Sequence, residues 1–205
     1  MPDPVSTWTA AILAGGRARR LGGCDKSTLR VGADTILGRQ LAVLRTLTPH
    51  ILLVGRHMAS ADMDVRVVPD RIAGAGALGG LYTALMEAPT EQVLVIACDM
   101  PFVSAPFLAE LARRGVGVEA AVPRDAGRRH PLCASYQRRI AARLRRHIDQ
   151  GALRIADALE DIDVIDIGRD ELAPFDPDDT LLLNVNTPAD YERARLAIGD
   201  KPPAA

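Results

Sequence analysis

The sequence predicts an α/β fold with a mostly parallel sheet covered by helices on both faces. Short apolar runs alternate with helical patterns through residues 8–114, and this alternation is typical of right-handed βαβ units. The run QVLVIACD at 92–99 is apolar almost throughout, which indicates a strand buried on both sides. Both observations favour a three-layer architecture.

The amino-terminal half supplies most of the expected elements. WTAAILA at 8–14 stops at a glycine pair, so we expect a buried strand that feeds a loop. Residues 35–47 have helical spacing, with apolar side chains at Ile36, Leu37, Leu41, Leu44 and Leu47. We further expect strands at 51–55, 65–69 and 92–99 and helices at 77–88 and 105–114, the last with Pro106 in its first turn.

The carboxyl-terminal half is less regular. We expect strands at 119–123 and 131–136, joined by a turn at 124–129, and then helical residues 138–160 in two pieces broken near Gly151. A strand at 163–167, a loop at 168–179, a strand at 180–186 and a helix at 188–198 complete the pattern. We expect one domain over 1–198 and a flexible tail over 199–205.

Composition excludes several classes of function. Of the 205 residues, 48% are hydrophobic, enough for a core, and the net charge of −1 creates no field toward nucleic acid or an anionic membrane. Aromatic residues make up 3%, too few for the stacking platforms of single-strand binders. No apolar run approaches the roughly 18 residues of a membrane span. We therefore expect no nucleic acid and no membrane among its partners.

The cysteines and the first residues indicate the compartment. The chain has three cysteines, Cys24, Cys98 and Cys133. An odd number argues against a disulfide framework, and their spacing matches no zinc site, so a reducing environment is favoured. The opening MPDPVSTW is acidic and contains prolines, unlike a signal peptide. The expected location is the cytoplasm.

Chemically unusual stretches follow three of the expected strands. Residues 14–26 come after the first strand, Asp99 after the central strand and Asn186 after the last. Because ligands of open α/β sheets bind outside the carboxyl ends of the strands, we expect one site there.

The loop ILAGGRARRLGGCDK at 12–26 suits phosphate groups. Its two glycine pairs expose backbone amides, and its arginines and Lys26 supply positive charge. It is not a Walker A motif, because Asp25 replaces the glycine before the lysine. The alternative is a surface loop with solvated arginines.

A second glycine loop, GAGALG at 74–79, matches the dinucleotide-binding pattern GxGxxG. In that pattern the loop follows its strand directly, whereas PDRIA separates Val68 from Gly74. A dinucleotide-binding enzyme is therefore the less favoured interpretation.

LAGGRARRLGGCDKSTL resembles the nucleotide-binding signature of molybdenum cofactor guanylyltransferases, which attach GMP to molybdopterin. PDRIAGAGALGGL, ACDMPF, RRHP and NVNTPADY resemble four further motifs of that family in the same order, so the likeness spans about residues 10–195. The resemblance implies a Rossmann-like three-layer nucleotidyltransferase fold. It also implies Mg-GTP and molybdopterin, or the molybdenum cofactor, as substrates, with Mg²⁺ as cofactor and pyrophosphate as product.

The resemblance assigns nucleotide-side residues by position. Leu13, Ala14, Gly15 and Gly16 match the backbone site for the guanine and ribose end. Lys26 matches the lysine that meets the nucleotide. Asp70 matches the aspartate before the second glycine loop, with an ordinary turn role after Pro69 as the alternative. Asp99 matches the magnesium-binding aspartate, with a turn or N-cap role as the alternative. Arg20 would join Lys26 in neutralising the phosphates during catalysis.

On the acceptor side, Asn184 and Asn186 match positions associated with the pterin. They are two residues apart in an expected strand, so we expect them on one face. The alternative for Asn186 is a turn before Thr187, which would cap the last helix. His130, with Arg128 and Arg129, is a candidate for contact with a phosphate.

Two departures leave the base preference open. Ala77 and Gly79 stand where the family usually has Pro and Ala, and LLVGRH lacks an Asn that relatives can carry near the nucleotide. The alternatives are a cytidylyltransferase of the same fold, acting on molybdopterin or another phosphorylated acceptor, and a catalytically silent nucleotide-binding module. Cofactor-delivering proteins and molybdoenzymes are expected as transient partners.

Overall fold

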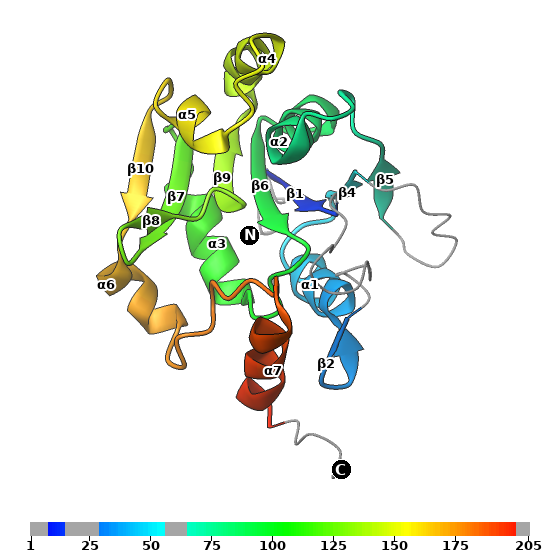
Figure 1. The fold of residues 1–205 in the computed structure, drawn as a ribbon. Coiled ribbons are helices and arrows are strands. Elements are labelled where there is room, and N and C mark those ends of the chain that lie inside the picture. Colours follow the sequence, from blue (N-terminus) through cyan, green and yellow to red (C-terminus); the bar gives the residue numbers. More distant parts are fainter. Residues whose placement is uncertain (1–7, 15–28, 56–64, 200–205) are drawn as a thin grey trace, which may run out of the picture.

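The computed structural model describes residues 8–14, 29–55 and 65–199. Its main sheet has the strand order β10-β7-β9-β6-β1-β4-β5, and the short β8 pairs with β7 (Figure 1). The strands are β1 (Trp8–Leu13), β4 (Ile51–Val54), β5 (Arg66–Val68), β6 (Gln92–Ala97), β7 (Ala120–Asp125), β8 (Arg128–Arg129), β9 (Cys133–Gln137) and β10 (Val164–Ile167).

Most neighbouring strands of this sheet are parallel, as expected. β1 pairs in parallel with both β6 and β4, β4 with β5, and β7 with β10. β9 lies antiparallel between β6 and β7, and its first residue Cys133 pairs with Ile96 near the end of β6. The amino end of β9 therefore meets the carboxyl end of β6 at one edge of the sheet.

Helices cover both faces of the sheet (Figure 1). On one face α1 (Ile36–Arg45) and α3 (Ala105–Arg114) pack against side chains that include Ile12 and Ile96. On the other face α2 (Gly76–Glu87), α4 (Ala141–Asp149) and α5 (Ile155–Leu159) pack against side chains that include Leu13 and Val95. Successive strand side chains alternate between the two faces, which confirms the three-layer fold.

A small third cluster contains a hairpin that the sequence did not predict. β2 (Arg30–Val31) and β3 (Asp34–Thr35) pair antiparallel around Gly32, whose φ is +72°. Val31 packs with Val185 and with Ala194 of α7 (Pro188–Ala197). Each strand of this hairpin is only two residues long, too short to show an alternating pattern.

The strand expected at 180–186 is absent, and this prediction was wrong. Asp176 Oδ1 accepts hydrogen bonds from the amides of Thr180 and Leu181, which turns the chain. Leu181 then packs on the α3 side of the sheet, whereas Val185 packs in the third cluster. The apolar run is split between two clusters and does not pair with the sheet.

Other boundaries agree with the expected pattern in outline. The helical residues after 138 begin with a 3₁₀ turn, η3 (Arg138–Ile140), and break at Gly151, whose φ is +73°. The expected loop at 168–179 contains α6 (Arg169–Leu172) and a second 3₁₀ turn, η4 (Ala173–Phe175). Within the described ranges, every helix is too short or too polar to cross a bilayer.

Candidate functional site

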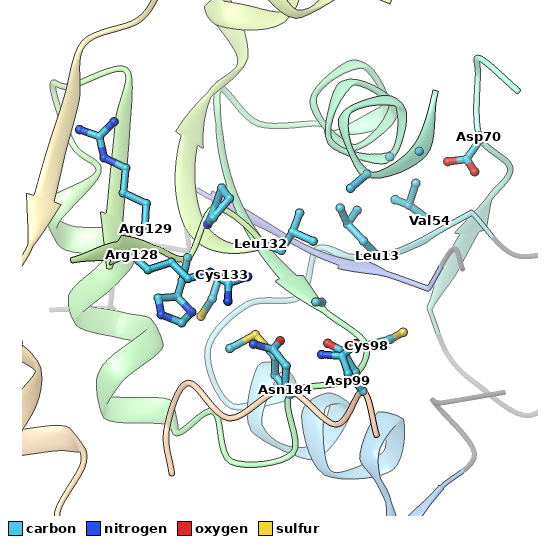
Figure 2. A pocket seen from close by; sticks show the side chains of 18 of the residues that line it. Leu13, Val54, Asp70, Cys98, Asp99, Arg128, Arg129, Leu132, Cys133 and Asn184 are labelled. Carbon is cyan, nitrogen blue, oxygen red and sulfur yellow. The ribbon is translucent and has the colours of Figure 1, made fainter. Parts of the chain in front are cut away.

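A cavity of about 680 Å³ opens at the carboxyl edge of the sheet (Figure 2). Leu13, Val54 and Ala97, the last residues of β1, β4 and β6, line it. Because β9 runs the opposite way, the chain that enters it also crosses this edge, and Leu132 and Cys133 line the cavity as well. The site lies at the edge that the sequence predicted.

The loop before α2 forms another wall of the cavity. Gly74 and Gly76 both line it, with φ values of +79° and +58°, a conformation that favours glycine. Gly80, one turn into α2, also lines it, and a Cβ there would lie 3.4 Å from Leu13 Cδ1. The wall is therefore formed largely by backbone at the amino end of a helix, where amides suit an anion.

Gly79 explains one departure from the family pattern. A Cβ at this position would lie 2.6 Å from the Cβ of Ala75 and 3.4 Å from the carbonyl oxygen of Ile72. Ala75 is itself buried, at 2% exposure. Glycine at 79 is thus a packing requirement of this particular loop.

Asp70 lies at the α2 side of the cavity (Figure 2). The Arg71 amide donates to Thr83 Oγ1 at 3.0 Å, and the Thr83 hydroxyl donates to the Gly79 carbonyl at 2.8 Å. These bonds hold the turn that carries Asp70 against α2. Partial desolvation raises the pKa of the Asp70 carboxyl above its ordinary value.

Asp99 follows the central strand β6 and is half-buried, with its Oδ1 atom inside the protein. The residue lines the cavity between Cys98 and Met100. Its carbonyl oxygen accepts a hydrogen bond of 2.8 Å from the amide of Val185. The turn after β6 is thereby joined directly to the segment that carries Asn184 and Asn186.

Asn184 and Asn186 both line the cavity, although they are not in a strand. Val185 between them is fully buried in the third cluster. The amide of Asn186 donates to Asp190 Oδ2 at 3.0 Å, and Thr187 Oγ1 accepts from the Asp190 amide at the start of α7. The two expectations for this segment are compatible: Asn186 faces the cavity while Thr187 caps the helix.

A second cavity, of about 530 Å³, adjoins the first. The side chains that line both cavities are Arg128, His130, Asn184 and Asn186. Arg169 and Arg193 line only the second cavity, together with carboxylates such as Asp125 and Asp179. The three residues with an expected acceptor role, His130, Asn184 and Asn186, therefore lie between two neighbouring cavities.

The two arginines before His130 differ in their partners. Arg129 Nε lies 2.6 Å from Asp166 Oδ1, and this bond raises the pKa of the guanidinium. Arg128 is exposed and forms no ion pair within the described ranges. Burial, and secondly the charge of Arg128, lower the pKa of His130 below its ordinary value, so the neutral imidazole is favoured.

Several predicted site residues lie outside the described residues. These are Gly15, Gly16, Arg20 and Lys26, which belong to residues 15–28. Ala14 is described: it is buried, and its amide donates to the Val54 carbonyl at 2.8 Å. Of the predicted residues that the structure describes, Leu13, Asp70, Asp99, His130, Asn184 and Asn186 line one cavity.

One residue near the site was missed by the sequence reasoning. Gln40 lies on the buried face of α1, and its side-chain amide donates to two carbonyls of the Asp99 turn. The available signal was a polar residue at an apolar position of a helical pattern, between Leu37 and Leu41.

Asp99 and Asp70 are the two carboxylates among the described residues that line the first cavity. Mg²⁺ is typically held by one or two carboxylates, with water and phosphate oxygens as its other ligands. Among the residues with assigned structure, no three His, Cys, Asp or Glu side chains are clustered for metal binding. Burial raises the pKa of the Cys133 thiol to about 12, so the neutral thiol is favoured at the wall of the cavity.

Comparison with known proteins decides the family. Residues 10–162 match the model of the MobA-like NTP transferase domain. The chain belongs to that family. The MobA-like NTP transferase domain therefore covers β1 to α5, and the protein is a nucleotidyltransferase.

Individual relatives cover nearly the whole chain. It is 35% identical to the probable molybdenum cofactor guanylyltransferase of Chloroflexus aggregans, over 92% of this chain and 93% of that protein. It is 32% identical to the protein of the same name from Pelotomaculum thermopropionicum, over 92% of each chain. Its fold is similar to that of molybdopterin-guanine dinucleotide biosynthesis protein A from Archaeoglobus fulgidus, with a TM-score of 0.81, 27% identity, and coverage of 94% and 100%. The similarity to these proteins therefore extends beyond residues 10–162, the part of the chain that matches the family model.

Proposed function

We propose that this enzyme transfers GMP from Mg-GTP to the terminal phosphate of molybdopterin, releasing pyrophosphate and forming the guanine dinucleotide form of the molybdenum cofactor. One observation carries the proposal. A cavity at the carboxyl edge of the sheet neighbours a second cavity, and Arg128, His130, Asn184 and Asn186 line both. Two adjoining spaces suit a reaction in which two large anions meet end to end.

The first cavity is proposed to hold the nucleotide. Leu13 and the glycines before and within α2 leave space at one wall, where the base and ribose would lie. The amides at the amino end of α2 and the arginines and lysine of residues 17–26 would hold the phosphates. Within that loop Lys26 and Arg20 are assigned to the α-phosphate and the departing pyrophosphate.

The second cavity is proposed to hold part of the acceptor, molybdopterin. The amides of Asn184 and Asn186 offer both donors and acceptors to a pterin ring. The terminal phosphate of molybdopterin would lie at the boundary, near Arg128 and the neutral His130, with one of its oxygens directed at the α-phosphorus of GTP. Positioning two reactants in this way supplies much of the rate increase in such transfers.

In this reaction a new P–O bond forms between the acceptor oxygen and the α-phosphorus, while the bond to the pyrophosphate oxygen breaks. Asp99 would hold Mg²⁺, which neutralises the charge on the phosphate oxygens when it is bound. The carboxylate of Asp99 is kept at the cavity by the turn after β6 and by the bond from Val185. The amides and cations of this chain then stabilise the departing pyrophosphate.

Several broader expectations belong to the same proposal. The chain would act as one domain over residues 1–198, in the cytoplasm, with cofactor-delivering proteins or molybdoenzymes as transient partners. The arginine-rich helix α4 gives limited support for such docking, because Arg143 is bonded to Glu119 and Arg145 to Asp149. These pairs favour a solvated surface over an unoccupied basic patch.

The test is pyrophosphate release by the purified protein with Mg²⁺, molybdopterin and either GTP or CTP. Release with GTP alone is the expected result, and release with CTP would overturn the base preference. A silent nucleotide-binding module would bind nucleotide without release. Asp99→Ala and Lys26→Ala are expected to lose turnover while keeping a wild-type circular dichroism spectrum, and near-normal rates in either variant would contradict its assigned role.

A further inference from the structure

Gln40 is a buried polar residue on an otherwise apolar helix face. Its side chain is fully buried, and Ile36, Leu37, Leu41 and Leu44 surround it on the same face of α1. A buried amide is unfavourable unless it forms hydrogen bonds. The position therefore calls for a specific polar contact.

That contact is with the turn after β6. Gln40 Nε2 donates to the carbonyl oxygen of Ala97 at 2.8 Å and to that of Met100 at 2.9 Å. These two carbonyls bracket Cys98 and Asp99. Because carbonyls only accept, the NH₂ end of the amide must face the turn, and one side chain holds both ends of the segment.

The same turn is held from two further directions. Arg39, next to Gln40 on α1, donates from Nε to the Pro101 carbonyl at 3.2 Å. On the opposite side of the chain, the Val185 amide donates to the Asp99 carbonyl at 2.8 Å. The main chain from Ala97 to Pro101 is thus fixed by side chains of one helix and by the acceptor segment.

The hydrogen bonding of this glutamine is one-sided. Its Oε1 atom is buried and has no hydrogen-bond partner among the residues that the structure describes. An unsatisfied buried acceptor costs about 1–3 kcal/mol, and the two bonds from Nε2 offset this cost. The contribution of the side chain is therefore concentrated in its bonds to the turn that carries Asp99.

We propose that Gln40 is a positioning residue that fixes Asp99 for binding the metal ion of the metal–nucleotide substrate. This inference rests on the proposed function, because it takes Asp99 as the metal ligand. A cation held by a single protein carboxylate and phosphate oxygens depends on the orientation of that carboxylate. Without the amide, the Asp99 turn would sample other conformations, and the metal–nucleotide complex would bind more weakly.

The chain contains a matched control at the other end of the same strand. Gln92, the first residue of β6, is also buried, and its Nε2 donates to the Ala112 carbonyl and to Ser135 Oγ. Gln40→Met and Gln92→Met each remove a buried amide that donates two hydrogen bonds, at least one of them to a main-chain carbonyl, with little change in volume. Only the first lies next to Asp99.

The experiment measures Mn²⁺ binding in the presence of GTP, by the electron paramagnetic resonance signal of free Mn²⁺, without any acceptor. Gln40→Met is expected to raise the dissociation constant of Mn²⁺ about tenfold, in line with the loss of residues that orient metal ligands. Gln92→Met is expected to stay within about twofold, since an amide remote from the ligand does not orient it. Thermal unfolding of both variants reports the structural cost separately.

Equal Mn²⁺ affinities in the two variants would overturn the proposal, as would a wild-type protein that binds no Mn²⁺ with GTP. If Gln40→Met does not fold, Arg39→Met removes the neighbouring bond from a half-buried position. It is expected to weaken Mn²⁺ binding in the same direction, and unchanged affinity there would overturn the proposal. The Mn²⁺ experiment contains no acceptor, so its result does not depend on whether molybdopterin is the acceptor. A failure of GMP transfer to molybdopterin is detected by the separate measurement of pyrophosphate release.

Discussion

Arg128 and Arg129 are adjacent residues with different roles in the structure. The guanidinium of Arg129 is bonded to Asp166 and lies 3.6 Å from Glu160, so it stabilises the sheet edge. Arg128 lines both cavities and forms no ion pair with a carboxylate in the described part of the chain. A motif with two arginines thus supplies one structural cation and one that is available to a ligand.

Arg128→Gln is expected to raise the KM for molybdopterin by about tenfold, because a hydrogen bond to a charged group contributes about 1.5–3 kcal/mol. The KM for GTP should change little. Steady-state kinetics with each substrate varied in turn check this. Arg124→Gln is the control, since Arg124 is exposed and already paired with Asp166; equal effects in the two variants would refute the assignment.

Some site residues were predictable from the sequence because their chemistry is visible in a single position. Asp99 ends an apolar run, and Asn184 and Asn186 interrupt another. Gln40 was not recognised, because one glutamine in a helical pattern is also compatible with a surface position. Its function depends on two carbonyls more than fifty residues away, and no local pattern contains that contact.

At the scale of elements, Gly74 just before α2 and Gly76 at its first position have positive φ, and α2 contains two more glycines, at 79 and 80. The latter two have different surroundings. A Cβ at 79 would meet Ala75 Cβ at 2.6 Å, whereas a Cβ at 80 would meet Leu13 Cδ1 at 3.4 Å. One glycine is required by packing within the element, and the other keeps the cavity open.

Gly79→Ala is expected to destabilise the protein by about 1–3 kcal/mol through overpacking. Gly80→Ala is expected to leave the free energy of unfolding unchanged or higher by up to about 1 kcal/mol, because alanine is the better helix former. Urea unfolding of the two variants provides the comparison. A Gly79→Ala protein as stable as Gly80→Ala would show that the loop before α2 relaxes freely.

The amino end of α7 couples helix capping to the cavity. Asp190 accepts from the amides of Asn186 and Thr187 and completes a capping box with Thr187. The Asp190 carboxylate therefore holds both the start of α7 and the backbone of Asn186, which lines the cavity.

Asp190→Ala should lower the free energy of unfolding by about 1 kcal/mol, the usual cost of a lost cap. It should also raise the KM for molybdopterin, because the Asn186 backbone loses an anchor. Thermal unfolding and kinetics measured on the same preparation test both effects. A change in stability with an unaltered KM would restrict Asp190 to capping.

Element boundaries were predictable where one helix or strand lies in one layer. β1, β4 and β6 agree with their apolar runs because both faces of each strand are buried, and α1 and α3 agree because each has one buried face. The apolar run at 180–186 failed as a strand because Leu181 and Val185 pack into different clusters. Periodicity indicates that a residue is buried, but the partner that buries it depends on the tertiary structure.

At the scale of the whole molecule, Glu119 joins three elements. Its carboxylate is bonded to Arg143 of α4 and accepts from the Asp163 amide, at the start of β10, at 2.9 Å. It lies directly before β7. The hydrogen bond from Arg143 lowers the pKa of Glu119 from its ordinary value of 4.5, against the opposing effect of burial.

This lowered pKa makes stability depend on pH. The unfolded chain takes up a proton at Glu119 before the folded chain does, so the stabilisation is present above pH 4.5 and is lost as the pH falls below it. Glu119→Gln should therefore be less stable than the wild type near neutral pH and should lose less stability on acidification.

Chemical denaturation at about pH 7 and about pH 4 measures this difference. Glu192→Gln is the control, because Glu192 belongs to an exposed pair within α7, and such pairs contribute little. If the free energy of unfolding fell by the same amount in Glu119→Gln and in the wild type between these two pH values, the carboxylate would contribute nothing to the acid sensitivity.

The bond from the Val185 amide to the Asp99 carbonyl also sets the order in which the site forms during synthesis. A ribosome produces a chain from its amino end, so β1, β4, β6 and β9 exist before Val185 has been translated. Until then Asp99 lacks this support, and the wall formed by Asn184 and Asn186 is missing. The nascent protein can assemble most of its sheet early, but the cavity wall formed by Asn184 and Asn186 is added only after β10 has been made.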